Sequence, residues 1–383
     1  MKSSLGKIFL GAFGFIIFSL VLSIGKVFGI QVRIGRIHTQ AFGHFCEEFD
    51  MVLGKPLDKK TVDFWIPMKK KSNKFLWSLF KANAITAPHS LFDLTYSLLQ
   101  RGKKEALLSK ENIPSYSNIP ITRFESIRST EIVKKKLFLP LGFNQLKDTS
   151  RKIVVVCVRD SGYDEQNVNS EEMVESVGFR NNEIQKFIPA IEYLTSNGYN
   201  VVRMGRHNKE KVDINHYYDY SKDFLSSDEN DFAWFNLAEF VISTGFGAEE
   251  AGALLRKKIY LVNVAPLDCL RKSSVYPFSL PMIHFKRSNK QLMRVSEIYS
   301  RGADKCYTRQ QMDSIDLSVA SNTPETIKRF TEQIVNYERG LEKGGVENPS
   351  LNSLKSKPSV SKYWPNFMES AVDENLLYLN VMD

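Results

Sequence analysis

The second half of the chain alternates short apolar runs with helical patterns, and this alternation limits the possible folds more than any other feature. Residues 153–158 form a continuous apolar run rich in valine, which is typical of a strand buried on both faces of a sheet. Further strands are predicted at residues 200–204, 240–243 and 258–262, and helices at residues 182–196, 231–237, 248–256 and after the capping Thr323. Strand–helix repetition at this spacing predicts a parallel, doubly wound sheet.

The first half of the chain opens with a related pattern. Residues 29–35 predict a short strand that ends in glycine, and residues 44–53 predict a helix, which is the opening of a Rossmann-type unit. Weaker patterns predict a strand at residues 64–67 and helices at 77–80 and 91–99. The predicted fold class is therefore α/β, with two Rossmann-like lobes preceded by an N-terminal hydrophobic helix. The predicted divisions are the helix at 1–28, a first lobe at 29–147, a second lobe at 148–343 after a polar linker at 145–152, and a tail at 344–383 that could pack back on the first lobe, with a last helical piece at 364–379.

The N-terminal segment is uncharged from residue 8 to residue 25, which is at the short end of what can cross a bilayer as a helix. Lys2 and Lys7 precede this run and Lys26 follows it. A cleaved signal peptide is one alternative, but no small-residue cleavage site ends the run. A buried core helix is the other, but the run is apolar on all sides rather than striped. We therefore predict a retained membrane anchor, with the lobes on the cytoplasmic side.

The charge balance is basic, with a formal net charge of +9 over 383 residues. Nucleic acid, an anionic membrane surface or phosphorylated small molecules could each explain this excess. Much of it lies in the first third of the chain, in lysine runs that are solvated faces or, near a membrane, attract anionic lipid headgroups. The runs lack interleaved aromatic residues and any known motif, which argues against a nucleic-acid partner. The four cysteines lack zinc-binding spacing and no Asp-x-Asp pair occurs, so no metal site is predicted.

A glycine-rich loop follows the predicted strand at 240–243. Ser243, Thr244, Gly245 and Gly247 stand between this strand and the helix predicted at 248–256. Free backbone amides and the positive end of the helix dipole would meet there, which suits a phosphate or diphosphate. The loop is neither a dinucleotide-binding fingerprint nor a Walker A motif. A simple glycine turn with a helix cap is the alternative.

Polar side chains follow the other predicted strands of the second lobe. Arg159 comes after the strand at 153–158, and Arg206 comes after the strand at 200–204. The carboxyl ends of parallel strands line the ligand crevice, and the arginine fork matches phosphate oxygens. The alternative for each arginine is a surface ion pair with a carboxylate. Glu249 could bind a ribose or sugar hydroxyl and Asn263 a base or sugar, unless they only complement the helix dipole or cap a turn.

The first lobe offers candidates for a general base. His38 and His44 flank the first glycine turn, and either could deprotonate an acceptor hydroxyl. His44 lies close in sequence to Glu47 and Glu48, which could orient it. We take His44 and Glu47 as the predicted catalytic residues, with a purely structural role as the alternative.

The chain resembles a family of bacterial glycosyltransferase-like proteins found with surface-polysaccharide biosynthesis genes. The matching segments are residues 33–35, 158–160, 198–205, 219–220, 243–247, 262–263 and 292–297. The resemblance implies a GT-B fold in which the second lobe binds a nucleotide-sugar donor and the first lobe binds the acceptor, without an obligatory metal. It implies that Arg159, Arg206 and the loop at 243–247 hold the donor diphosphate. It also implies that Gly35 and Arg36 lie at the floor of the acceptor side.

Sugar transfer from a nucleotide-sugar to a lipid-linked or polysaccharide acceptor is therefore the leading functional prediction. The nucleotide-sugar is a substrate, so no cofactor is predicted, and the predicted partners are the donor, the acceptor and the membrane. A transferase for a pyruvyl or sugar-phosphate group on the same scaffold is one alternative. A non-catalytic, membrane-attached scaffold is the other.

Overall fold

The computed structural model consists of two compact units, residues 1–136 and residues 137–383, called here the first and the second unit. The structure describes residues 2–54, 60–101, 121–124, 126–162, 176–210, 212–245, 247–269, 273–277, 279–293 and 295–341. The division falls before the linker expected at 145–152. The expected tail at 344–383, including its helical piece, lies outside the described residues. The arrangement of two lobes of GT-B type stays a prediction.

The second unit is built on a six-stranded sheet in which every neighbouring pair is parallel. Its strands are β4 (Lys152–Cys157), β5 (Tyr199–Arg203), β6 (Tyr217–Asp219), β7 (Ala238–Ser243), β8 (Lys258–Val264) and β9 (Ser279–Pro281). The order across the sheet is β6-β5-β4-β7-β8-β9, so the direction in which strands are added reverses between β4 and β7. This is the strand order of a Rossmann sheet, and it confirms the predicted parallel sheet.

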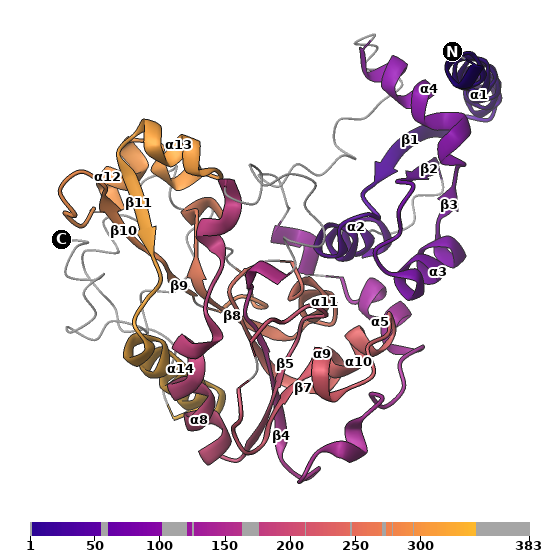
Figure 1. The fold of residues 1–383 in the computed structure, drawn as a ribbon. Helices are drawn as coiled ribbons and strands as arrows, with labels where there is room; N and C mark the ends of the chain where they lie inside the picture. Colours follow the sequence, from indigo (N-terminus) through magenta and orange to yellow (C-terminus); the bar gives the residue numbers. More distant parts are fainter. Residues whose placement is uncertain are drawn as a thin grey trace. The chain divides into compact units, whose positions relative to one another are not determined.

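The central strands form the core because both of their faces are covered. Val154, Val155, Val201 and Val202 are fully buried, which explains why these strands are continuous apolar runs rather than alternating ones. Figure 1 shows helices α8 (Ile188–Ser196) and α14 (Pro324–Glu338) on one side of the sheet and α10 (Asn230–Leu237) and α11 (Glu250–Leu254) on the other. The remaining elements of this unit are α9 (Tyr220–Asp223), α12 (Val295–Ser300), α13 (Arg309–Ser314) and an antiparallel pair, β10 (Ile283–Lys286) and β11 (Leu317–Ala320).

The helix termini follow the sequence signals to different degrees. The Thr323 hydroxyl accepts a hydrogen bond from the amide of Thr326 at 3.2 Å, which confirms the predicted cap of α14. The helix expected at 248–256 is much shorter, because α11 spans only Glu250–Leu254. Arg256 has a left-handed backbone with φ of 60°, and this conformation ends the helix early.

The first unit contains a smaller parallel sheet with the order β1-β2-β3. Its strands are β1 (Gln31–Ile37), β2 (Thr61–Pro67) and β3 (Ile85–Thr86), and its helices are α1 (Lys2–Val27), α2 (Phe42–Gly54), α3 (Lys74–Asn83), α4 (His89–Arg101) and α5 (Arg128–Lys134). The alternation of strand and helix predicted for this half of the chain is confirmed. Residues 9–27 of α1 are long and apolar enough to cross a membrane, a property that signal sequences and buried core helices can share.

The expected glycine turn at Gly35 is wrong. Strand β1 continues through Gly35 to Ile37. A Cβ atom at Gly35 would lie 2.7 Å from the ring of Trp65, which is itself buried on β2. The glycine is required because the indole ring occupies the space of a side chain, and not because the chain turns there.

Replacement of Gly35 by alanine is therefore expected to lower the free energy of unfolding by about 1–3 kcal/mol, because the added methyl group overpacks against Trp65. Urea unfolding followed by tryptophan fluorescence measures this change. Gly178→Ala is the matched control, since a Cβ atom there would have its nearest neighbour at 4.0 Å. Equal unfolding midpoints for the two variants would contradict the packing explanation.

Candidate functional site

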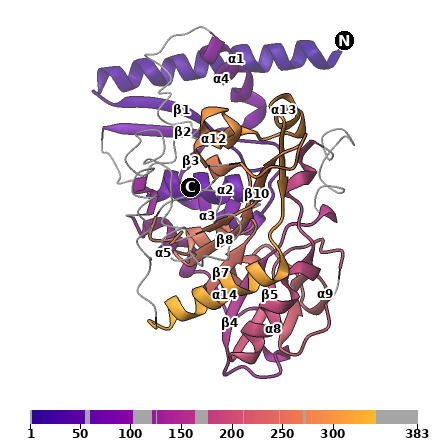
Figure 2. The same cartoon turned by 90° about the vertical axis from the view of Figure 1, so that its left-hand side faces the viewer.

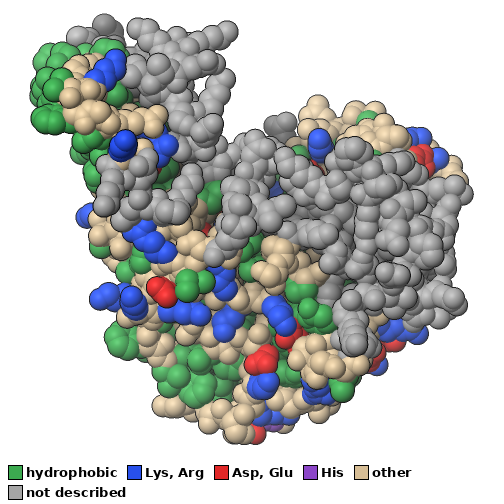
Figure 3. Space-filling model, turned by 180° about the vertical axis from the view of Figure 1, so that it is seen from behind, with side chains coloured by type: hydrophobic (Ala, Val, Ile, Leu, Met, Phe, Trp, Pro, Cys, Tyr) green, Lys and Arg blue, Asp and Glu red, His purple; other side chains and the backbone are tan. Residues whose placement is uncertain are grey.

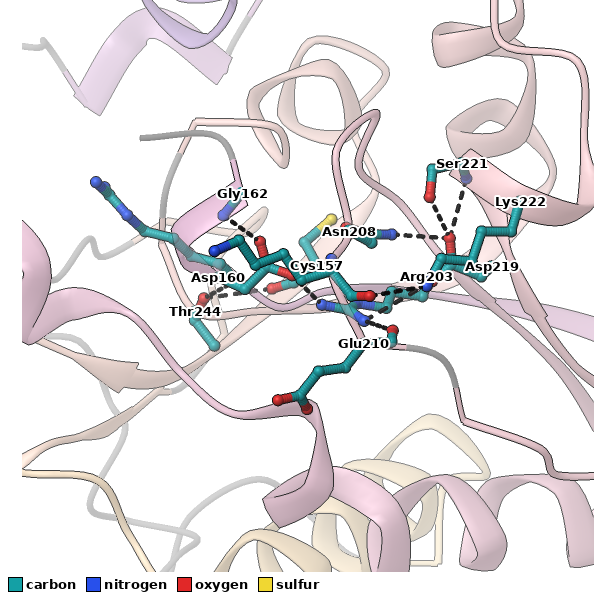
Figure 4. Close-up of polar contacts among 12 residues, drawn as sticks. Cys157, Asp160, Gly162, Arg203, Asn208, Glu210, Asp219, Ser221, Lys222 and Thr244 are labelled. Carbon is teal, nitrogen blue, oxygen red and sulfur yellow. Dashed lines mark hydrogen bonds and ion pairs between the residues drawn. The ribbon is translucent and has the colours of Figure 1, made fainter. Parts of the chain in front are cut away.

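The loops that follow β4 and β7 meet where the strand order of the sheet reverses. The amide of Thr244 donates a hydrogen bond to the carbonyl of Cys157 at 2.9 Å. The Thr244 hydroxyl accepts a hydrogen bond from the amide of Arg159, also at 2.9 Å (Figure 4). In open parallel sheets, ligands bind outside the carboxyl ends of the strands at such a reversal. The structure thus brings Arg159 and the loop at 243–247 together, as the sequence predicts.

The backbone of the glycine loop needs conformations that only glycine adopts easily. Gly245 and Gly247 have φ values of 72° and 101°, and Phe246 between them lies outside the described residues. The Ser243 hydroxyl accepts from the amide of Gly245 at 3.1 Å, and a carboxylate oxygen of Glu249 accepts from the amide of Gly247 at 2.9 Å. The Glu249 carboxylate therefore holds the position at Gly247 that was predicted for a phosphate oxygen.

The helix dipole contributes less at this loop than the sequence predicts. Helix α11 has five residues and begins at Glu250, so few peptide dipoles align behind the loop. The loop can still offer backbone amides to an anion, but an anion at Gly247 has to replace Glu249.

Burial, with Glu249 nearby, raises the pKa of the Cys157 thiol well above its usual range, so this cysteine is an inert core residue.

Arg206 lies after β5 and forms ion pairs with two aspartates. Its guanidinium is 2.5 Å from a carboxylate oxygen of Asp231 and 2.8 Å from one of Asp228. The hydroxyl of Tyr220 donates to Asp231 at 2.9 Å and fixes that carboxylate. Burial lowers the pKa of Arg206, but the two carboxylates together raise it above its ordinary value. Arg206 thus forms the ion pair with carboxylates that was the alternative to phosphate binding. A diphosphate would have to compete with both aspartates for its guanidinium.

The sequence reading missed Arg203, the last residue of β5, which is fully buried. Its guanidinium lies 2.9 Å from the carboxylate of Asp160, donates to the carbonyl of Glu210 at 2.9 Å, and lies 3.7 Å from the carboxylate of Asp219 (Figure 4). Asp160 follows β4 and Asp219 ends β6, so one arginine connects the carboxyl ends of three neighbouring strands. The available signal was an arginine inside an apolar run, with aspartates at the ends of the adjacent strands.

The loops around Arg203 approach each other closely. A Cβ atom at Gly162 would lie 2.0 Å from the carbonyl oxygen of His207. Gly205 has a φ of 142°, and a Cβ atom there would lie 2.2 Å from the side chain of Asn208. A larger residue at Gly162 would push apart the loops after β4 and β5, and one at Gly205 would distort the loop after β5.

Asn263 is part of a buried group of three asparagines. Its side-chain nitrogen donates to Asn182 at 2.8 Å, and its side-chain oxygen accepts from the amide and the side chain of Asn322 at 2.9 and 2.7 Å. Its backbone is left-handed, with φ of 55°. These bonds hold the end of β8 in place, and the contact of Asn263 with a base or sugar stays a prediction.

In the first unit, the histidine that pairs with a carboxylate is His38, which follows β1. Its amide donates to one oxygen of Glu48 at 2.6 Å, and its Nδ1 lies 2.5 Å from the other. The hydrogen bond with Glu48 raises the pKa of His38 above 6.5 by more than burial lowers it. The ring of His44 stands edge-on to that of His38, with centroids 6.5 Å apart. The two histidines expected around the start of α2 thus lie together.

Glu47 belongs to a different, buried ion cluster. One of its carboxylate oxygens lies 3.6 Å from Arg123, and Arg123 lies 2.8 Å from Asp50. The structure pairs His38 with Glu48, and the catalytic role of His44 and Glu47 stays a prediction. Helix α2 turns Glu48 toward the end of β1 and Glu47 toward Arg123, a distinction that sequence proximity does not reveal.

Arg36 and Gly35, which were expected on the acceptor side, both serve packing within the first unit. The Arg36 guanidinium lies 2.6 Å from Asp93, donates to Ser97 at 2.9 Å and stacks over Tyr96 at 4.7 Å. These three partners lie on α4, so Arg36 attaches β1 to that helix. Gly35 makes room for the indole ring on β2, as described above.

Comparison with known proteins gives only remote matches. No family model matches the chain, and no curated protein matches it. One similar solved structure is the ADP-heptose lipopolysaccharide heptosyltransferase II of E. coli, with 9% identity, a TM-score of 0.34, and coverage of 61% of this chain and 84% of that one. Another is a putative UDP-N-acetylglucosamine 2-epimerase from Listeria monocytogenes, with 10% identity, a TM-score of 0.34, and coverage of 82% of this chain and 98% of that one. A function therefore has to be inferred from the site itself.

Replacement of Arg203 by methionine is expected to lower the free energy of unfolding of the second unit by about 3–5 kcal/mol, because Asp160 and Asp219 lose their cation in a buried position. Urea unfolding followed by circular dichroism measures the loss. Arg287→Met is the control, since Arg287 pairs with Asp313 at the surface and its removal should cost about 0–1 kcal/mol. Similar losses in both variants would show that Arg203 does not organise the strand ends.

Proposed function

We propose that the protein is a glycosyltransferase that uses a nucleotide-sugar donor, and that the donor diphosphate binds at the carboxyl ends of β4 and β7. The observation that carries this proposal is the pair of hydrogen bonds joining Arg159 and Cys157 to Thr244 at the point where the strand order reverses. The backbone of Arg159 and a glycine loop with left-handed residues then border the same position, and the Nε of Arg159 donates a hydrogen bond to Asn181 at 3.0 Å. This combination suits two linked phosphates better than a neutral ligand.

The proposed chemistry breaks the bond between the sugar and the diphosphate and forms a bond between the sugar and an acceptor oxygen. Negative charge builds up on the departing nucleoside diphosphate, and Arg159 together with the amides of the loop stabilises it. Ser243 and Thr244 hold the loop in place, because both side chains are buried and form hydrogen bonds with backbone amides. Glu249 is proposed to exchange its bond to Gly247 for one to a hydroxyl of the donor. Arg206 is left out of the donor site because Asp228 and Asp231 already compensate its charge.

The acceptor hydroxyl loses its proton in this reaction, and we assign the base to His38. The Glu48 carboxylate holds the ring and stabilises the imidazolium that forms after proton uptake. The side chain of His38 is 40% exposed, so its second ring nitrogen can be reached by a substrate. The acceptor is proposed to be a lipid-linked or polysaccharide glycan at the cytoplasmic face of a membrane, with α1 as the attachment.

A selective thermal shift by one nucleoside diphosphate is the first expected outcome. ADP and UDP are the first probes, followed by GDP and CDP, because binding to the folded state alone raises the melting temperature. Arg159→Gln should weaken that binding about 10- to 100-fold, since a charge-assisted hydrogen bond contributes about 1.5–3 kcal/mol. Arg287→Gln is the control with the same change at a distant ion pair. If no nucleotide shifts the melting temperature of the wild-type protein, the non-catalytic scaffold is favoured instead.

The rate of sugar transfer is expected to rise with pH through the raised pKa of His38, because a general base has to be neutral. The acidic limb of kcat/KM should then lie above 6.5, the ordinary pKa of histidine. Glu48→Gln removes the main cause of the raised pKa and should move this limb to lower pH. His38→Ala should reduce kcat by about 10²- to 10⁴-fold, whereas His44→Ala serves as the control. A limb that does not respond to Glu48→Gln would exclude His38 as the base.

A further inference from the structure

Helix α1 turns three glycines inward and most of its large apolar residues outward. Gly11, Gly14 and Gly25 are buried, and a Cβ atom at Gly25 would lie only 2.7 Å from Val32 of β1. The large apolar side chains of this segment that are between 43% and 80% exposed are Phe9, Leu10, Phe13, Phe15, Ile16, Leu20, Ile24, Val27 and Phe28. Figure 3 shows such hydrophobic side chains covering the outer surface of this helix. A helix packed in water has the opposite pattern, so an apolar phase is expected on this face.

The inner face of α1 is packed on the folded first unit. Phe18, near the middle of the helix, is 3% exposed and belongs to a cluster with side chains of β1, β2 and α4. The buried members of this cluster are Phe18, Val32, Ile34, Ile66, Ala87, Phe92 and Tyr96. Figure 2 shows α1 running alongside β1 and β2 over most of their length, next to α4. The helix is therefore one layer of the first unit and not a separate rod.

This packing decides how α1 can meet a bilayer. The strands beneath it carry an ion pair between Arg33 and Asp63 at 2.6 Å, and Arg36 of β1 is paired with Asp93 of α4. If α1 crossed the membrane, these charges and the edges of a three-stranded sheet would enter the hydrocarbon. Open sheet edges do not occur in contact with lipid chains, and charged residues there are costly. A helix that lies in the plane of the interface avoids both problems.

The distribution of charge identifies the kind of surface. The first unit has 22 lysines and arginines against 10 aspartates and glutamates, a net charge of +12. The whole chain has a net charge of +9, so the second unit is slightly acidic. Lys2 and Lys7 lie near the start of α1, and Lys26 is in its last turn. Cations at both ends of an apolar helix can reach headgroups of one leaflet, and anionic lipids attract them.

We propose that the first unit is a membrane-binding module in which the outer face of α1 inserts into one leaflet of an anionic bilayer, with the helix axis in the membrane plane and neither end crossing. This inference rests on the membrane attachment in the proposed function and is independent of the sugar chemistry. The inner glycines let α1 pack tightly on the first unit, and the large outer residues enter the boundary between headgroups and acyl chains.

Sedimentation of the full chain with vesicles tests the binding face. Vesicles of phosphatidylcholine with phosphatidylglycerol should bind the protein more tightly than phosphatidylcholine alone, and added salt should weaken the difference. The variant Ile16→Glu, Leu20→Glu, Ile24→Glu should lose about 100-fold or more in partitioning, because three outer side chains no longer enter the lipid. The control is Phe138→Glu, Leu225→Glu, Leu341→Glu, which changes three exposed apolar residues of the second unit. Equal loss in both variants, or no loss in the first, would overturn the assignment of the face.

Labelling of the two ends of α1 separates an in-plane helix from a spanning one. Single cysteines are introduced as Ser4→Cys or Lys26→Cys in a Cys269→Ser background, since the other native cysteines are buried. A membrane-impermeant maleimide should label both positions from the same side, in inverted vesicles but not in intact cells. Labelling from opposite sides would show a spanning helix and refute the in-plane geometry. A protein that stays soluble would refute membrane attachment itself, while nucleotide binding by the second unit would remain to be judged by its own thermal-shift result.

Discussion

The buried guanidinium of Arg203 is the interaction on which the candidate donor site depends. It connects the carboxyl ends of three adjacent strands through Asp160, Asp219 and the carbonyl of Glu210. A charge at this depth is tolerated only because opposite charges and hydrogen bonds surround it. The same network fixes where the chain leaves β4, and Arg159 follows directly. A cation that contacts no ligand in the proposal thus fixes the loop on which Arg159 stands.

The acidic residues near the proposed diphosphate position act as anionic partners for donor groups at the strand ends. Glu249 accepts from the Gly247 amide, and two aspartates flank Arg206. Backbone amides and guanidinium groups at strand ends need anionic partners when they are partly removed from water. Side-chain carboxylates provide these partners within the protein itself. A diphosphate at Gly247 would have to exchange with this existing anion, so its binding would depend on the difference between two sets of hydrogen bonds.

The two units differ in the surface that each presents. The second unit buries a conventional parallel sheet between helices, and its overall charge is slightly negative. The first unit holds all of the excess positive charge and an outward apolar helix face. The histidine–carboxylate pair of His38 and Glu48 lies in this same first unit. A lipid-linked acceptor would accordingly meet the unit that carries both the membrane-binding helix and the proposed base.

The sequence alone determined the central strands β4, β5, β7 and β8 of the second unit and the meeting of the loops after β4 and β7, because burial on two faces leaves continuous apolar runs and parallel strands end at one edge. It also indicated the apolar N-terminal helix. Only the tertiary structure decided the partners of the charged groups. Arg203 and Asp160, which form an ion pair, are 43 residues apart in the sequence, and His38 pairs with Glu48 rather than with Glu47. Local periodicity encodes which residues are buried, whereas the pairing of charges depends on strand register, loop paths and helix rotation, which no local pattern records.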